Sequence, residues 1–218
     1  GDDDLLETRN HVFWDAMLNH IRLDGFVRMP QRVLDVGCHR GGLLARIAQA
    51  WGGNEFWGIE PIGAARARAQ LRLNSMVQSV SMLSPGQWAL VPEQGIDLVV
   101  CHEVLFLLED LDDFVANIAR VLASGARAYV VTGCHSENPI WPAWRQAFES
   151  VGKTVYTHAP LSLMNHAGKH GLVPAVRPLR DSGWATFDPN DVSFAYPSVE
   201  ALLVHQFRHK LLFRLTKK

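Results

Sequence analysis

The sequence predicts an α/β fold: a doubly wound, mostly parallel sheet with helices on both faces. Short apolar segments such as Glu55–Ile59 and Leu98–Cys101 alternate with helical segments such as Leu43–Trp51. This alternation is typical of parallel strands joined by right-handed crossovers. Leu98–Cys101 is apolar without interruption, as expected of a strand that helices cover on both faces. A length of 218 residues suits one sizeable domain, so we expect residues 1–218 to form a single unit.

Composition limits the partners that we expect. The chain carries 21 basic and 22 acidic side chains, a balance that argues against a general nucleic-acid binder. No apolar run approaches the length of a membrane span, and the acidic start at residues 2–4 is unlike a secretory signal. Three cysteines without a framework spacing fit a reducing compartment. We therefore expect a cytoplasmic protein without membrane or nucleic-acid partners; its oligomeric state is not predicted.

The first predicted element is an amphipathic helix over Leu5–Leu23, ended by Asp24 and Gly25. Its apolar side chains recur on one helical face: Leu6, Phe13, Trp14, Met17, Leu18 and Ile21. We expect residues 1–25 to form a helical cover over one side of the sheet, or over the mouth of a ligand site.

A ligand-binding turn is predicted over Arg32–Gly42, between a short strand and the helix Leu43–Trp51. Gly37 lets the backbone approach a ligand closely, and Gly41 lets the turn fold back without a Cβ clash. Asp35 ends the strand and is placed to hold a cationic or hydroxylated group. The helix start offers free N–H groups to an anion. This arrangement suits a cofactor that contains adenosine.

The middle of this turn distinguishes between cofactors. A dinucleotide fingerprint requires a glycine at the position of His39, where a Cβ and an imidazole would obstruct a pyrophosphate. The run Asp35–Gly41 (DVGCHRG) resembles the first motif of the class I S-adenosylmethionine-dependent methyltransferases, Asp-Val-Gly-Cys-Gly-Thr-Gly in its common form. The resemblance implies a cofactor without phosphate. It also implies a seven-stranded sheet of order 3-2-1-4-5-7-6 whose last strand is antiparallel.

The resemblance extends along the chain. Glu60 and Pro61 follow the second strand about 20 residues beyond the turn, where an acid accepts hydrogen bonds from ribose hydroxyls. Residues 95–132 read as the fourth strand, a helix over Leu111–Leu122 with Asp110 as N-cap, and the fifth strand. Leu161–Arg180 resembles the family's late helix and sixth strand.

The resemblance implies a set of cofactor-binding residues: Asp35, Gly37, Cys38, His39, Gly41, Glu60, Pro61 and Cys101. Three features depart from the family pattern. His39 replaces a small residue, and Leu107 stands where many relatives carry a histidine after the fourth strand. Ser81–Trp88 lacks the acid that relatives often place against the adenine amino group. Ser81, Ser84 or Gln87 would have to substitute for that acid.

Each cysteine is followed by a histidine: Cys38-His39, Cys101-His102 and Cys134-His135. On the family's strand order these pairs fall at the ends of three adjacent strands. Zinc ligation is one explanation, but the spacing is not that of zinc motifs and neighbours on a strand point to opposite faces; we expect no metal. Acid–base chemistry is the second, with His102 and His135 as the catalytic residues and Glu103 as a further candidate. The third is that the cysteines are small buried residues at strand ends and the histidines are turn residues bonded to the backbone. We expect the other histidines, such as His166, His170, His205 and His209, to be structural or surface residues.

After Thr132 the pattern loosens. Asn138–Trp144 opens a helix to about Ser150, with Pro142 in its first turn. Residues 182–198 carry Trp184, Phe187, Phe194 and Tyr196, and we expect this segment to cap the substrate side or to pack on the flank of the sheet. The alternating tail, residues 207–218, is predicted to be the last strand.

The predicted function is methyl transfer from S-adenosylmethionine to a small-molecule acceptor by in-line displacement. The acceptor atom is not predicted. An alternative is a non-catalytic S-adenosylmethionine-binding or regulatory protein, which the altered turn and the missing adenine acid motivate. A nicotinamide-dependent oxidoreductase ranks third, because its fingerprint is broken and no second substrate domain follows.

Overall fold

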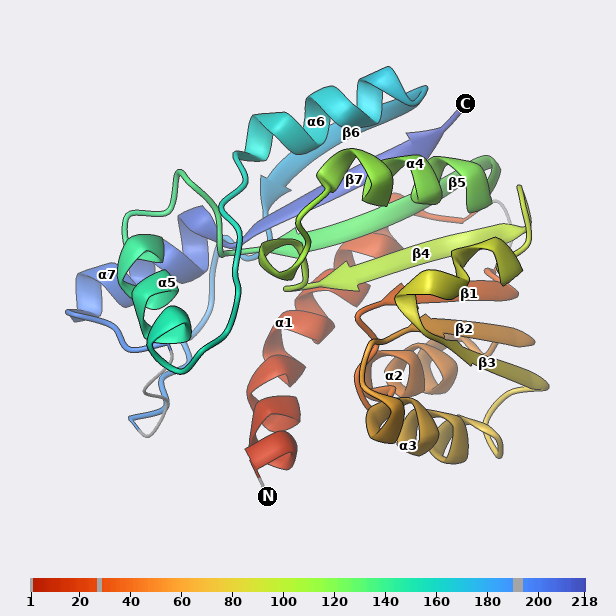
Figure 1. Cartoon of the computed structure of the whole chain (residues 1–218), viewed down its shortest axis with the longest axis horizontal. Helices are drawn as coiled ribbons and strands as arrows, with labels where there is room; N and C mark the ends of the chain where they lie inside the picture. Colours follow the sequence, from red (N-terminus) through yellow and green to blue (C-terminus); the bar gives the residue numbers. More distant parts are fainter. Residues whose placement is uncertain (1, 27–28, 190–193) are drawn as a thin grey trace.

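The computed structural model describes residues 2–26, 29–189 and 194–218. Seven strands form one sheet of order β3-β2-β1-β4-β5-β7-β6 (Figure 1). The strands are β1 Arg32–Val36, β2 Glu55–Ile59, β3 Ser79–Leu83, β4 Ile96–His102, β5 Leu122–Thr132, β6 Leu172–Pro178 and β7 Leu211–Lys217. Strands β1 to β5 pair in parallel, and β7 lies antiparallel to both β5 and β6. The predicted sheet, its order and its antiparallel last strand are confirmed.

The helices follow the predicted order. They are α1 Asp2–Asp24, α2 Gly42–Trp51, α3 Gly63–Leu73, α4 Leu111–Val121, α5 Trp141–Ser150, α6 Pro160–Lys169 and α7 Val199–Val204. Pro142 lies in the first turn of α5, and Asp110 caps α4 by accepting the N–H of Asp113 at 2.9 Å, both as predicted. The predicted last strand begins later than expected, because His205–His209 forms a π-helical turn before β7.

Helices α1, α2 and α3 cover one face of the sheet. Met17 and Ile21 of α1 and Leu44 and Ile47 of α2 are fully buried in the cluster on this face. Burying one such side chain contributes about 1.5–3 kcal/mol, and the helical spacing of the apolar residues is what aligns them. Leu6 is an exception: it was predicted on the apolar face of the first helix and is 39% exposed.

The end of α1 is fixed to the sheet by polar contacts. Asp24 accepts the hydroxyl of Tyr129 on β5 at 2.8 Å and the guanidinium of Arg214 on β7 at 3.1 Å. Arg127 donates to the carbonyl of Gly25 at 2.9 Å, and Gly25 has a φ of 72° that ends the helix. These contacts fix the C-terminal end of α1 against the sheet.

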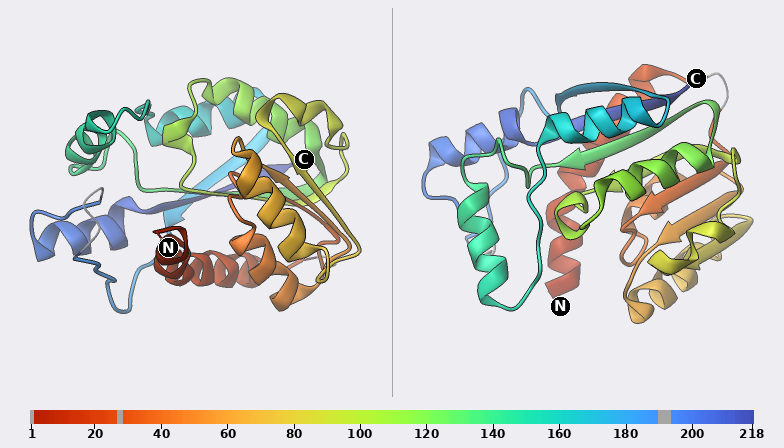
Figure 2. Two further views of the ribbon diagram at one scale, coloured as in Figure 1. Left: turned by 60° about the horizontal axis from the view of Figure 1, so that its bottom comes forward. Right: turned by 45° about the horizontal axis from the view of Figure 1, so that its top comes forward.

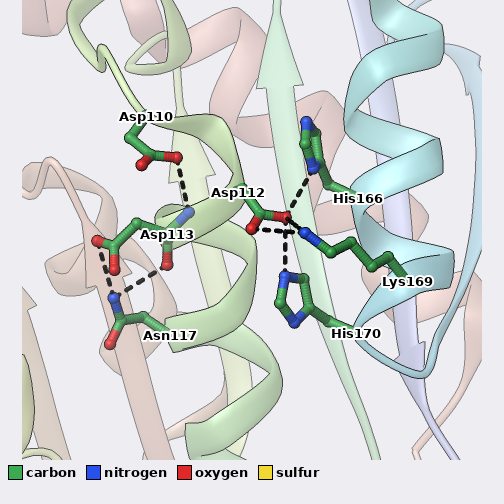
Figure 3. Close-up of polar contacts among 7 residues, drawn as sticks. All are labelled: Asp110, Asp112, Asp113, Asn117, His166, Lys169 and His170. Atoms are coloured by element: carbon green, nitrogen blue, oxygen red, sulfur yellow. Dashed lines mark hydrogen bonds and ion pairs between the residues drawn. The ribbon is translucent and has the colours of Figure 1, made fainter.

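Helices α4 and α6 cover the opposite face, and a polar cluster joins them (Figure 3). Asp112 Oδ1 on α4 accepts from His166 Nδ1 at 2.8 Å and from His170 Nε2 at 2.9 Å, and Asp112 Oδ2 accepts from Lys169 Nζ at 2.9 Å. Hydrogen bonds from Lys169, His170 and His166 hold the pKa of Asp112 well below its usual range. His166 and His170 thus join two helices, which agrees with the structural role expected for them.

Helices α5 and α7 lie together beyond the carboxyl ends of the parallel strands (Figures 1 and 2). Trp144 of α5 contacts Phe194 and Tyr196, with ring centroids 5.0 and 5.4 Å apart. Trp184 is 91% exposed and Phe187 is 62% exposed. The aromatic side chains of the predicted cap segment therefore differ: Phe194 and Tyr196 pack against Trp144, whereas Trp184 and Phe187 are exposed to solvent. Residues 190–193 of this segment lie outside the described residues.

Among the described helices, none combines the length and apolar character that a membrane span requires.

Candidate functional site

The strand order reverses between β1 and β4, and ligands of α/β sheets bind outside the carboxyl ends of the strands at such a point. Asp35 on β1 lies there, opposite Gly58 of β2 and Val100 of β4. Its side chain is 2% exposed, and the described residues provide no hydrogen bond or ion pair to its carboxylate. Burial, with the nearby charge of Glu60, raises the pKa of Asp35 to about 8. A carboxylate in this environment favours a proton or a bound cation.

The turn after β1 folds back on the end of β2. The N–H groups of Gly37 and Cys38 both donate to the carbonyl of Ile59, at 2.8 and 3.2 Å. Gly37 and Gly41 have φ values of 79° and 74°, and His39 has a φ of 47°. The first two positions therefore suit glycine, and His39 adopts a conformation that costs an L-residue roughly 1 kcal/mol or more.

Glu60 connects the turns after β1 and β2. It is 5% exposed, and its two carboxylate oxygens accept the N–H of His39 at 3.1 Å and the N–H of Ile62 at 2.9 Å. A carboxylate has about four lone-pair sites, so oxygen sites remain for ligand hydroxyls. Pro61, the next residue, is exposed. The placement of Glu60 is compatible with the ribose contact predicted for it.

Val104 fills the space above the turn. A Cβ added to Gly37 would lie 2.2 Å from Val104 Cγ2, so glycine at this position makes room for the valine. Glu103, just before it, has a φ of 55°, a left-handed conformation that is unusual for a glutamate. The side chain of Val104 therefore lies directly against Gly37 at the strand reversal.

Ser84 and Gln87, expected as substitutes for the adenine acid, contact each other. The backbone N–H of Ser84 donates to Gln87 Oε1 at 2.9 Å, and the Ser84 hydroxyl donates to the same oxygen at 3.0 Å. They cap the short 3-10 helix Pro85–Leu90, and Gln87 keeps its amide nitrogen for another partner.

The three cysteines are free thiols whose side chains are buried. Cys38 packs against Gly58 and Met82, with its Sγ 3.7 Å from the Met82 sulfur, and Cys101 and Cys134 are 0% and 3% exposed. Only the backbone of Cys38 and Cys101 can therefore face a ligand in this arrangement. Over the part of the chain that the structure describes, no three His, Cys, Asp or Glu side chains are arranged to hold a metal ion.

His102 ends β4 and lies beneath α1. Its ring is 6.4 Å from that of Phe13 and 6.3 Å from that of Trp14, measured between centroids. Its Nε2 is buried and has no hydrogen-bond partner in the described part of the chain. Burial and the charge of Lys210 lower the pKa of His102 to about 3, so the imidazole is neutral at pH 7.

Glu103 and Lys210 form an ion pair beside His102. Glu103 accepts from Lys210 Nζ at 2.5 Å and from the N–H of Gly133 at 3.0 Å. Burial alone would raise the pKa of Glu103, but Lys210, His102 and the N–H of Gly133 together outweigh burial and bring the pKa to about 2. Sequence reasoning missed Lys210, because one lysine in an alternating tail carries no signal of burial; its side chain is 7% exposed.

His135 follows the carboxyl end of β5, and His205 is the first residue of the π-helical turn. His135 Nε2 lies 2.7 Å from the carbonyl of His209, and its Nδ1 is buried and, within the described residues, without a partner. Asn138 donates to the carbonyl of Gly133 at 2.6 Å and lies 3.1 Å from His205 Nδ1. Burial lowers the pKa of both His135 and His205, that of His205 to about 3. Asn138 and His205 were not predicted as site residues, since only the folded chain brings them together.

Residues 34–128 match a family model described as a methyltransferase domain. This segment is therefore similar to methyltransferase domains. The domain is similar to a probable tocopherol O-methyltransferase of Oryza sativa subsp. japonica, at 33% identity over 115 residues, which is 51% of this chain and 32% of that protein. It is also similar to the tocopherol O-methyltransferase of Arabidopsis thaliana, at 31% identity over 137 residues, or 59% of this chain and 39% of that one. The matches thus cover about a third of the length of these chloroplastic relatives.

The methyltransferase fold extends over the whole chain. A solved methyltransferase, from the complex with the Haloferax volcanii Trm112 methyltransferase activator, superposes with a TM-score of 0.74. The superposition covers 99% of this chain and 94% of that one at 18% sequence identity. At this identity the likeness establishes the fold.

Proposed function

We propose that this chain transfers a methyl group from S-adenosylmethionine to a small-molecule acceptor. The observation that carries the proposal is the carboxylate of Asp35, buried at the strand reversal without a partner in the described part of the structure. A buried carboxylate without a counter-charge is unfavourable. S-adenosylmethionine carries a sulfonium and an ammonium group, and either cation would stabilise ionised Asp35, directly or through water.

The other residues at this edge fit the same cofactor. Gly37 and Gly41 would line its methionine and sugar side together with His39 and the backbone of Cys38. Glu60 and Pro61 would hold the ribose, and the backbone at Cys101 would contact the methionyl end. The cofactor has no phosphate, so it does not need the N–H groups that Gly37 and Cys38 already donate to Ile59. Rotation of Val104 away from Gly37 would admit it.

The bound cofactor supplies an electrophilic methyl group, and the chain has to position and deprotonate the acceptor. We assign that role to His102 and His135, each neutral and each with one ring nitrogen that the described residues leave unbonded. Burial and Lys210 disfavour the protonated ring that would form when His102 takes the acceptor's proton, and the negative charge of Glu103, next to His102, offsets part of this effect on the pKa.

Several observations favour the acceptor class. The balanced charge of the chain supports a small molecule over a nucleic acid. The O-methyltransferase names of the two curated relatives support an oxygen as the acceptor atom. The buried free thiols of Cys38, Cys101 and Cys134 agree with action in a reducing cytoplasm.

A non-catalytic cofactor-binding protein is the second candidate, and His39 in the turn and the lack of an acid in Ser81–Trp88 favour it. The two functions separate in an assay with S-adenosylmethionine labelled on its methyl group and a panel of phenols, carboxylic acids and amines. We expect labelled product with at least one oxygen acceptor, and none with Asp35→Ala. Cofactor binding without transfer to any member of the panel would favour the non-catalytic function.

A further inference from the structure

The ring of Phe13, from α1, lies near two positively charged side chains from distant parts of the chain. Lys210 Nζ lies 4.1 Å from the centroid of this ring, and Arg180 Cζ lies 6.0 Å from it. The ring of His102 stacks against the same phenylalanine. This region adjoins the carboxyl end of β4, next to the histidine assigned to the acceptor.

The charges around Phe13 do not balance. Lys210 is paired with Glu103, but the guanidinium of Arg180 has only neutral partners among the described residues. It donates to Gln206 Oε1 at 3.2 Å and to the carbonyl of Trp184 at 2.7 Å, and it stacks on Phe207 at 5.3 Å. Burial lowers the pKa of Arg180, as expected of a cation that lacks a counter-charge. Of these two cations, only Lys210 is paired with a carboxylate among the described residues.

Lys210 has donors to spare. An ammonium group carries three N–H bonds, and in the described structure one of them reaches Glu103 while Phe13 faces the group. The side chain of Lys210 is 7% exposed, so water does not readily satisfy the others. An oxygen of a bound ligand would accept hydrogen bonds from these remaining N–H groups.

Glu103 holds this lysine at a cost in backbone conformation. Its φ of 55° lies in a region that a glutamate rarely adopts, and such strain is frequent where a side chain serves a ligand site. A Cβ added to Gly133 would lie 2.5 Å from His205 Cε1 and 3.2 Å from Glu103 Oε1, so glycine is needed for these side chains to approach. The fold thus places a cation, a base and an aromatic ring at one point.

We propose that Lys210, with the charge of Arg180, forms an anion-binding end of the acceptor site, and that the acceptor is a small molecule bearing a carboxylate. This proposal rests on the proposed function, because it assigns the substrate class of the same site. The ligand carboxylate accepts from Lys210 in place of, or together with, Glu103, and the flat part of the ligand lies against Phe13.

The test uses matched pairs of planar probes: benzoate and benzamide, cinnamate and cinnamamide, indole-3-acetate and indole-3-acetamide. Binding is measured by calorimetry on the protein saturated with S-adenosylhomocysteine. We expect at least one carboxylate to bind about tenfold or more tightly than its amide, since charge-assisted hydrogen bonds are about twice as strong as neutral ones. Equal affinities within every pair would overturn the proposal.

Variants separate ligand binding from folding. Lys210→Met should remove the preference for the carboxylate, whereas Arg208→Met, which removes an exposed charge two residues away, should leave it intact. Glu103→Gln should strengthen carboxylate binding severalfold, because a competing carboxylate is gone; loss of folding would weaken it instead. A preference that survives Lys210→Met, or that Glu103→Gln weakens, would contradict the assignment.

The affinity of each variant for S-adenosylhomocysteine reports separately on the proposed function. Absence of that binding in the natural chain would reject the proposed function. Intact binding without a carboxylate preference would reject only the carboxylate site.

Discussion

Replacing Asp35 with asparagine is expected to change how the stability of the protein depends on pH. Burial and Glu60 raise the pKa of Asp35 from 3.8 to about 8 in the folded chain. Between these values the folded state retains a proton that the unfolded state has lost. The stability of the natural chain therefore falls as the pH rises from about 4 to about 8, and the asparagine variant lacks this contribution.

The size of the effect follows from the difference in pKa. One pKa unit corresponds to about 1.4 kcal/mol, so the natural chain loses roughly 3 to 4 kcal/mol through Asp35 between pH 5 and pH 8. That is a large fraction of the roughly 5–15 kcal/mol that stabilises a typical domain. Asparagine has nearly the same shape, and any fixed cost of burying its amide cancels when the two pH values are compared.

The assay is urea unfolding of both proteins without cofactor at pH 5, 6, 7 and 8. We expect the free energy of unfolding of Asp35→Asn, relative to the natural chain, to increase steadily with pH. The control is Ile47→Val, a fully buried side chain of α2, whose cost of about 0.5–1.5 kcal/mol should be the same at each pH. A constant difference between Asp35→Asn and the natural chain would refute the reasoning about this carboxylate.

Three further predictions concern the crevice, the acceptor side and the α4–α6 contact. Val104→Ala should keep or increase affinity for S-adenosylhomocysteine, and Val104→Trp should lower that affinity more than tenfold, because the ligand would displace the side chain above Gly37. Equal affinities of the two variants, measured by calorimetry, would show that the crevice is not the cofactor site. His102→Ala and His135→Ala should lower kcat on an identified acceptor by about 10²–10⁴-fold with little change in cofactor affinity. Full turnover in both variants would exclude their acid–base role. Asp112→Ala should lower the melting temperature measured by calorimetry, since it removes the acceptor shared by His166 and Lys169 of α6 and by His170, which follows α6. An unchanged melting temperature would mean that these contacts contribute nothing to stability.

The fold was predictable because local patterns determine its elements. The apolar strands, the spacing of Phe13, Met17 and Ile21, and the cap at Asp110 each have a signature that tertiary structure did not override. The prediction that Leu6 is buried was wrong: Leu6 follows the helical spacing of the apolar residues, but it lies near the start of α1, beyond the part of the helix that packs on the sheet. The π-helical turn before β7 has no comparable signature in the sequence.

The candidate site was predictable where one motif carries it. Asp35, Gly37 and Glu60 lie at strand ends whose order the family resemblance implies, and they meet at the strand reversal. The partners of Glu103 are separated from it along the chain: Gly133 by 30 residues and Lys210 by 107. No local pattern reports such contacts, so Lys210, Asn138 and His205 appear only in the structure.

Calorimetric titration with S-adenosylmethionine and S-adenosylhomocysteine, with NAD as the control, is the most direct test of the proposed function. We expect saturable one-to-one binding of both S-adenosyl ligands, no binding of NAD, and loss of the S-adenosyl binding in Asp35→Ala. Absence of binding by the natural chain, or affinity unchanged in Asp35→Ala, would contradict the assignment of the cofactor site.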